Sequence, residues 1–224
     1  MQVVVIDGTG VNTLTGEGLA EVLEGAQVVV DVSNSPSFAD DDAMEFFRTS
    51  TASLLKAEGE AGVTHHVALS VVGAEHLQDS GCLRAEQAQE ELIKASGIPF
   101  SIVHTTRFFE FMKGIAAEAT EDDTVRLAPA TIRPIHSDDV AATVGRTALG
   151  TPVNGVVEMS GSDTFQLDEV IRKGLAAKND PRTVVTGPHA RYFGAELQKT
   201  TLLPGPDARI ADTRFTQWLA QQQA

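Results

Sequence analysis

The chain opens with the stretch MQVVVIDGTG, Met1–Gly10, in which an apolar run leads directly into a glycine-rich turn. Three more runs rich in β-branched residues follow in the first half of the chain. Strands of a parallel sheet have this continuous apolar character because helices cover both of their faces. We therefore predict strands at Val3–Ile6, Val28–Val32, His66–Ser70 and Phe100–Val103.

Helical patterns separate these strands. An apolar stripe that includes Phe47 and Leu54 follows the acidic residues 40–42, which favour the positive end of a helix dipole. A second stripe runs from Cys82 to Ser96 and stops at Gly97. This alternation predicts an α/β fold, a doubly wound parallel sheet that binds ligands at the carboxyl ends of its strands.

In the second half of the chain, strand and helix patterns still alternate but are less regular. The patterns predict a helix at Ser137–Leu149 capped by Ser137, a strand at Val156–Met159, a helix at 167–175 behind a capping box of Asp163 and Gln166, and a short helix around Trp218. We predict a single domain over residues 1–224, in which residues 150–224 form a small C-terminal cap.

Charge and composition exclude several classes of partner. The chain of 224 residues has 17 Lys and Arg against 31 Asp and Glu, a net charge of −14. Such a surface repels nucleic acids and anionic membranes, so a small-molecule substrate is expected. The single cysteine, Cys82, cannot form an internal disulfide, and no leader or spanning segment is visible. We expect a cytoplasmic protein, and the sequence leaves open whether it is a monomer or a homodimer.

The glycine-rich turn is a candidate phosphate site. A turn after a strand presents backbone N–H groups to a pyrophosphate, which points to Gly8, Thr9 and Gly10. The third glycine of a dinucleotide fingerprint would fall at position 13, which is Thr13. Asp31 ends the second strand, where an acid binds a ribose hydroxyl. A tight turn without any ligand is the alternative interpretation.

A resemblance to a known family covers nearly the whole chain. It is carried by the segments Gly8–Gly10, Thr15–Leu19, Val28–Ser37, His65–Ala74, Gly97–Val103, Phe108–Phe111, Ile135–Ala141 and Ala190–Leu197. Together they resemble an NmrA-like atypical short-chain dehydrogenase/reductase. The resemblance implies a Rossmann-like core that binds NADP or NAD, together with a small C-terminal substrate cap. It also places Ser70 at the family's catalytic serine. We expect Ser33, Asn34, Ser70 and Thr105 to border the cofactor.

Two departures from the family change the expected chemistry. The glycine turn passes from Gly10 to Val11 without the usual helix and strand, so the phosphate cradle lacks its helix dipole. The family's Tyr-Lys pair corresponds to Cys82 and Glu86. A glutamate cannot replace the lysine cation, and a neighbouring carboxylate does not activate a thiol. Carbonyl reduction by the usual Tyr-Lys route is therefore not expected.

Other candidate residues follow the fourth strand. His104 ends that strand and is either a general acid or base, or a hydrogen-bonded histidine at the start of a loop. The adjacent residues His65 and His66 point to opposite faces of a strand, so no metal site is predicted there. Aromatic side chains that line a substrate pocket, or alternatively fill a core, are Phe108, Phe109, Phe111 and Tyr192.

Three functions remain in competition. The first is an NAD(P)-dependent oxidoreductase-like enzyme that acts on a small carbonyl or quinone-like molecule, with Ser70 and His104 polarising the substrate. The second is a non-redox isomerase, cyclase or lyase that uses Ser70, Cys82, Glu86 or His104 for proton transfer. The third is a cofactor-sensing module without turnover.

Overall fold

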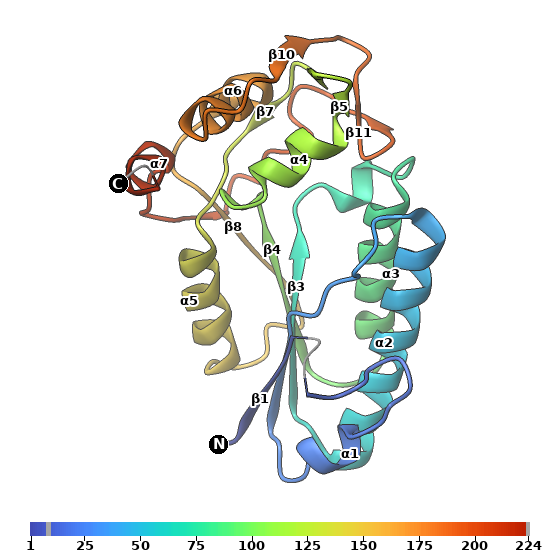
Figure 1. Cartoon of the computed structure of the whole chain (residues 1–224). Coiled ribbons are helices and arrows are strands. Elements are labelled where there is room, and N and C mark those ends of the chain that lie inside the picture. The colour runs from blue at the N-terminus through green and yellow to red at the C-terminus, as the bar shows by residue number, and fades with distance from the viewer. Residues whose placement is uncertain (8–9, 223–224) are drawn as a thin grey trace. The chain divides into compact units, whose positions relative to one another are not determined.

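A computed structural model describes residues 1–7 and 10–222, and the predictions for Gly8 and Thr9 lie outside the described residues (Figure 1). Its strands are β1 Val3–Ile6, β2 Val28–Asp31, β3 His65–Val71, β4 Phe100–Thr105, β5 Thr120–Glu121, β6 Thr124–Leu127, β7 Thr131–Ile132, β8 Gly155–Ser160, β9 Phe165–Gln166, β10 Thr183–Thr186, β11 Arg191–Tyr192, β12 Ala195–Glu196 and β13 Arg209–Ile210. Its helices are α1 Leu19–Val22, α2 Asp40–Ala61, α3 Gly81–Ala95, α4 Met112–Glu118, α5 Ser137–Ala148, α6 Leu167–Ala177 and α7 Phe215–Gln221.

The chain folds into two compact units. The first consists of Met1–Ser70, Gly81–His104 and Ala142–Val157, and the second of Val71–Ser80, Thr105–Ala141 and Glu158–Ala224. The second unit therefore includes segments that precede residue 150, the predicted start of the cap.

The main sheet has the strand order β1-β2-β3-β4-β8-β13. In the first unit the pairing is parallel, with Val3 opposite Val28 and Val28 opposite His65. Helices α2 and α3 pack side by side on one face of these strands, and the later residues of α5 lie on the other face (Figure 1). This arrangement confirms the predicted Rossmann-like α/β fold. It also corrects three strands' boundaries: β2 ends at Asp31, β3 extends over His65–Val71, and β4 continues to Thr105 and so contains His104.

The predicted apolar stripes form the core of the first unit. One cluster joins Ile6 of β1, Val29 of β2 and Leu54 of α2, and another joins Ala68 of β3 to Ile93 of α3. These buried side chains hold α2 and α3 against the sheet. Each fully buried Leu or Ile contributes about 1.5–3 kcal/mol relative to exposure.

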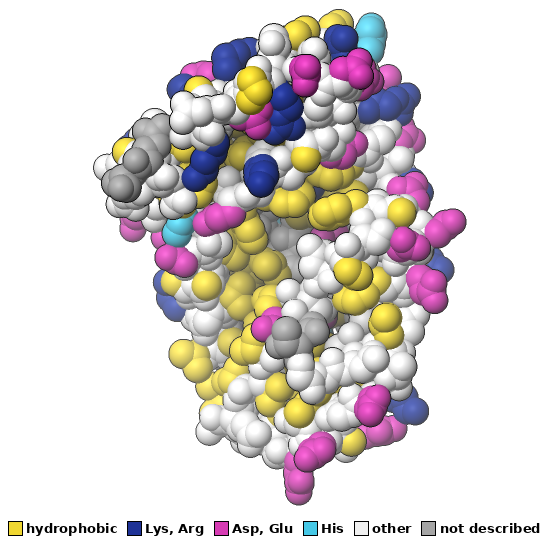
Figure 2. Space-filling view, in the orientation of Figure 1, with side chains coloured by type: hydrophobic (Ala, Val, Ile, Leu, Met, Phe, Trp, Pro, Cys, Tyr) yellow, Lys and Arg dark blue, Asp and Glu magenta, His cyan; other side chains and the backbone are white. Residues whose placement is uncertain are grey.

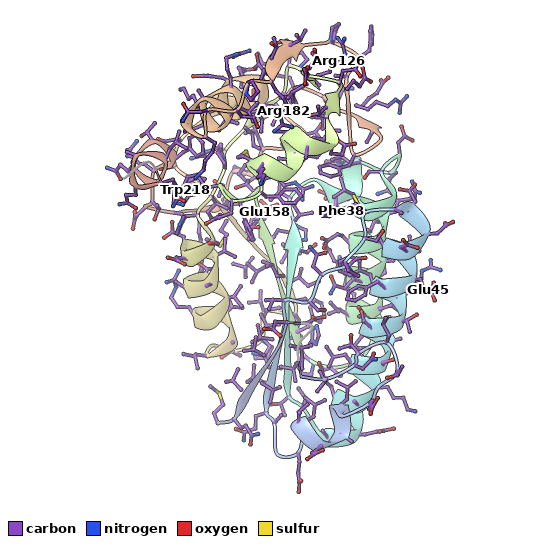
Figure 3. All side chains as sticks on the ribbon, viewed as in Figure 1. Phe38, Glu45, Arg126, Glu158, Arg182 and Trp218 are labelled. Atoms are coloured by element: carbon purple, nitrogen blue, oxygen red, sulfur yellow. The ribbon has the colours of Figure 1, made fainter. Side chains whose placement is uncertain are left out.

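The second unit contains shorter strands and an aromatic core. Strand β6 pairs with β5 antiparallel and with β10 parallel, while β11 and β12 form a hairpin. The Phe109 and Phe215 ring centroids lie 5.2 Å apart, and Trp218 packs against both rings. Figure 3 shows Trp218 on α7, which confirms the predicted terminal helix.

Two predicted helix caps are wrong. Ser137 is the first residue of α5, and its hydroxyl donates to Glu110 Oε1 at 2.7 Å rather than capping the turn. Instead, Asp138 N donates to His136 Nδ1 at 3.3 Å. The capping box before α6 also fails. Gln166 makes no side-chain cap bond, and Asp163 pairs with Arg214 at 2.7 Å.

Two features are absent from residues 1–7 and 10–222. No helix there combines enough length and apolar character to cross a membrane. No three His, Cys, Asp or Glu side chains gather there in a way that could hold a metal ion.

Candidate functional site

A hydrogen-bonded cluster lies near the carboxyl ends of β3 and β4, which are neighbours in the sheet. Ser70 of β3 donates through Oγ to Glu90 Oε1 at 2.7 Å. His104 of β4 places Nε2 at 2.7 Å from the same oxygen. Glu90 projects from α3, and Lys94, one turn later, contacts its other oxygen at 2.9 Å. The carboxylate thus joins a helix to two strands at the sheet edge where ligands bind in this class of fold.

The electrostatics of the cluster keep Glu90 ionised. Burial raises the pKa of its carboxyl, but hydrogen bonds and charge from His104, together with hydrogen bonds from Lys94 and Ser70, lower it from 4.5 to about 2. The carboxylate is therefore a hydrogen-bond acceptor at neutral pH.

This arrangement assigns different tasks to the two nitrogens of His104. With Glu90 ionised, His104 Nε2 must carry the proton of their hydrogen bond, which leaves Nδ1 for proton exchange. His104 is 8% exposed, and Nδ1 is not among the buried unpaired atoms of the described residues. By contrast, His65 Nδ1 and His66 Nε2 are buried without a hydrogen-bond partner. Of these three rings, His104 is the one suited to exchange protons with a ligand.

The structure places the predicted pair Cys82 and Glu86 on the first turns of α3. Cys82 is half-buried and packs against the apolar cluster around Ala43 and Phe47. Glu86 is also half-buried. The α3 acid bonded to Ser70 and His104 is Glu90, one turn after Glu86. The sequence interpretation missed Glu90, although the spacing of four places both acids on one helical face.

The residues predicted to contact the cofactor after β2 are largely bonded to one another. Asp31 is 2% exposed, and its Oδ1 accepts hydrogen bonds from Ser33 N at 3.0 Å and Ser33 Oγ at 2.6 Å. Its Oδ2 accepts from Gln89 Nε2 at 3.2 Å. Asn34 Oδ1 accepts from Ser35 N at 2.8 Å. The loop after β2 is therefore closed by its own side chains.

The described part of the glycine turn begins at Gly10, which has a φ of 79°. Such a left-handed conformation favours glycine. The next residues form a closed loop in which Asn12 Oδ1 accepts from Leu14 N at 3.0 Å and Thr15 N at 3.1 Å. The first helix, α1, begins only at Leu19 and has 4 residues. Among the described residues no long helix follows directly after the turn.

The remaining predicted residues belong to the second unit. Thr105 ends β4, and its carbonyl oxygen accepts from Val72 N at 3.0 Å. Phe109 and Tyr192 are each 2% exposed and belong to the buried core. Phe108 and Phe111 are half-buried, and Phe111 stacks on Phe193 at 6.0 Å. Half-buried rings retain the surface that a pocket lining needs, so the substrate role of Phe108 and Phe111 stays a prediction.

A second buried ion pair lies in the first unit at the amino end of β3, away from the carboxyl ends of the strands. His66 Nδ1 lies 2.9 Å from Glu58 Oε1, and both side chains are 0% exposed. His65 instead contacts Ser101 Oγ through Nε2 at 2.9 Å. This arrangement confirms that the two histidines point to opposite faces. Burial raises the pKa of Glu58. Burial also lowers the pKa of His66, but the hydrogen bond to Glu58 and the charges of Glu58 and Asp31 together outweigh it, so the pKa of His66 is raised.

Comparison by sequence finds no match, either to models of protein families or to curated proteins. Comparison of folds finds many solved structures. A nucleoside-diphosphate-sugar epimerase from Staphylococcus aureus has a TM-score of 0.61 and 16% identity, over 80% of this chain and 62% of that one. An NADPH-dependent quinone oxidoreductase from Escherichia coli, complexed with NADPH, has a TM-score of 0.58 and 19% identity, over 79% and 60%.

A third structure is covered more completely. It is a dTDP-glucose 4,6-dehydratase from Streptomyces venezuelae with NAD bound, which has a TM-score of 0.67 and 14% identity, over 94% of this chain and 76% of that one. By contrast, the chain spans less than two thirds of the length of the epimerase and of the quinone oxidoreductase. At these identities the likeness establishes the fold, a Rossmann-like α/β arrangement.

Proposed function

We propose that the chain is an NAD(P)-binding, oxidoreductase-like enzyme of the NmrA-like atypical short-chain dehydrogenase/reductase type, acting on a small carbonyl or quinone-like molecule. The observation that carries the proposal is the cluster of Ser70, Glu90 and His104 near the carboxyl ends of β3 and β4. The fold supports it, because the quinone oxidoreductase and the dehydratase that share it were crystallised with NADPH and NAD.

The described residues fit the reactive part of such a cofactor. Ser70 and His104 provide a hydroxyl and an imidazole near the ends of adjacent strands, and Thr105 follows directly in β4. We assign to these residues the contacts with the nicotinamide and its ribose. The cofactor, when bound, supplies hydride chemistry, while the protein supplies orientation and protons.

The protein's share of the reaction is proton transfer. The Glu90 carboxylate accepts the Nε2–H of His104 and so fixes the orientation of the ring. His104 Nδ1–H then donates a proton to the developing oxyanion of the substrate and regains one from water, a step worth about 10²–10⁴-fold in rate. The Ser70 hydroxyl, which donates its one proton to Glu90 in the structure, would turn to donate that proton to the same substrate oxygen. This route replaces the Tyr-Lys pair, whose positions hold Cys82 and Glu86.

A non-redox isomerase, cyclase or lyase is the second candidate. The observation that favours it is the short loop and 4-residue helix α1 where a dinucleotide site carries a full helix. In that case the same cluster would move a proton within the substrate, without net oxidation. A sensing module would bind the ligand without any turnover.

A turnover assay separates these functions. The purified chain is mixed with NADPH or NADH and a panel of quinones, aldehydes and ketones, and nicotinamide oxidation is followed by absorbance. We expect oxidation of NADPH or NADH that falls at least about a hundredfold in His104→Gln and persists in Glu91→Gln, an exposed neighbour on α3. Isomerisation without nicotinamide oxidation would favour the second candidate. Full turnover in His104→Gln would contradict the proposed mechanism.

A further inference from the structure

The strand order of the main sheet leaves β1 at its edge. The order β1-β2-β3-β4-β8-β13 follows the chain and never reverses. A dinucleotide fold has two mononucleotide-binding halves that meet where the strand order reverses, and the ligand spans that point. Here no described strand pairs with the outer side of β1. The strand that would carry the second half of the site is therefore missing from the described chain.

The surface of β1 is consistent with an edge position. Val3 and Val5 remain 37% and 59% exposed, whereas Val28 and Val30, their partners on β2, are each 4% exposed. Figure 2 shows hydrophobic side chains that reach the surface over the part of the first unit that contains β1. A first strand covered by helices on both faces would be buried like β2.

The acid expected to hold the adenosine ribose is already occupied. Both oxygens of Asp31 accept hydrogen bonds, from Ser33 on one side and from Gln89 on the other. The side chain is also 2% exposed. A ribose diol could bind Asp31 only by displacing buried partners, which costs the desolvation of the groups left unpaired.

The distribution of charge also argues against strong binding of the adenosine half of the cofactor. The sequence has no Lys, Arg or His before Arg48, but it has acids at Asp7, Glu17, Glu21, Glu24 and Asp31. The segment next to β1 therefore offers no cation to a pyrophosphate or to a 2′-phosphate. The backbone N–H groups of Leu14 and Thr15 are also used inside their own loop.

The other half of the site retains its chemistry. Ser70, Glu90 and His104 remain bonded near the ends of β3 and β4. We infer that the chain recognises the nicotinamide mononucleotide half of NAD(P), and that the adenosine half and its 2′-phosphate contribute little to binding. The inference rests on the proposed function and specifies which part of the cofactor these residues recognise.

Calorimetric titration of the whole chain tests the inference. The probes are reduced nicotinamide mononucleotide, NADH and NADPH, each titrated separately at the same ionic strength. We expect the three dissociation constants to lie within about tenfold of one another. Either dinucleotide binding more than about tenfold tighter than the mononucleotide would overturn the inference but leave the proposed function intact. Failure of all three to bind would overturn both.

Two variants locate the binding. Ser70→Ala is expected to weaken the mononucleotide and the dinucleotides by the same factor, because the lost contact belongs to their shared half. If Ser70→Ala weakened the binding of the dinucleotides but not that of the mononucleotide, the inference would be wrong. Glu45→Gln is the control. Glu45 is exposed and points away from the ribbon at α2, and the substitution removes one negative charge there (Figure 3). Thermal unfolding of each variant verifies that the fold is retained.

Discussion

Glu90 Oε1 lies 2.7 Å from His104 Nε2, so a residue of α3 fixes the ring of a residue in β4. The same oxygen accepts the hydroxyl proton of Ser70. A strand end alone leaves a histidine free to rotate, whereas this contact selects one tautomer and one ring orientation. The cluster therefore depends on the packing of α3 against the sheet as well as on the strand ends.

Glu90→Gln is expected to lower kcat by at least about tenfold, with a smaller change in KM, because an amide holds His104 in place less strongly than a carboxylate. Steady-state kinetics of the nicotinamide assay measure the effect. Glu91→Gln makes the same chemical change at the next residue, which is exposed, and should retain the wild-type rate. Equal kcat in both variants would remove Glu90 from the mechanism.

The contribution of the cluster to folding stability should depend on pH in the acid range. The folded-state pKa of Glu90 is lowered from 4.5 to about 2, so its contribution is complete above about 4.5 and is lost as the pH falls toward 2. Urea denaturation of wild type and Glu90→Gln at a series of pH values measures this contribution. We expect the wild type to lose its advantage over the variant across that window. A difference that stays constant from neutral pH to about pH 3 would contradict the assignment.

The buried pair of Glu58 and His66 should behave differently when one or both partners are removed. Glu58→Leu alone leaves His66 unpaired at 0% exposure and is expected to cost about 3–5 kcal/mol. Replacing both residues by leucine is expected to recover most of that loss, because an apolar pair of similar volume needs no buried charge. The free energy of unfolding in urea is the measurement. A double variant as unstable as the single one would show that the loss comes from packing.

The same pair predicts a loss of stability in alkali. The pKa values of Glu58 and His66 are both raised in the folded protein, so the folded chain binds more protons than the unfolded chain. Wild-type stability should therefore fall as the pH rises from the unfolded value of His66, 6.5, through its raised folded value. The double leucine variant should lack this contribution, and an unchanged pH dependence in that variant would argue against it.

Two glycines of the second unit should respond in opposite ways to alanine. At Gly161, which follows β8, an added Cβ would meet the carbonyl oxygen of Pro134, and we expect a loss of at least about 1–3 kcal/mol. At Gly174, inside α6, nothing lies within 4 Å of the added Cβ, and alanine should add about 0.5–1 kcal/mol. Chemical denaturation compares the two. Similar effects at both sites would contradict the close approach at Gly161.

The strands and long helices could be predicted from the sequence because their signals are local. The apolar run at Val3–Ile6 gives β1 its bounds, and the stripe through Phe47 and Leu54 lies within α2. Even Glu58 carried a signal, because it continues that stripe four residues after Leu54 and is buried with it. Local periodicity fixes which face of a helix is buried, whatever the residue type.

The candidate site was predicted only in part because its contacts are distant in sequence. Helical spacing puts Glu90 on the same face as the predicted Glu86, but it cannot show which of them reaches Ser70, 20 positions from Glu90. Asp31 had the expected place at the end of β2, yet its partner Gln89 lies 58 positions away and could not be foreseen. Such pairings depend on how α3 packs on the sheet, which no short pattern specifies.

Binding of a nicotinamide cofactor beside Ser70 and His104 can be measured in a single titration experiment. Intact chain is added to NADPH and, separately, to NADH while the fluorescence of the reduced nicotinamide is followed. We expect a saturable change with at least one of them, weakened in Ser70→Ala and retained in Glu91→Gln. If neither nucleotide gives a saturable change, the chain does not bind the cofactor and the proposed function is wrong.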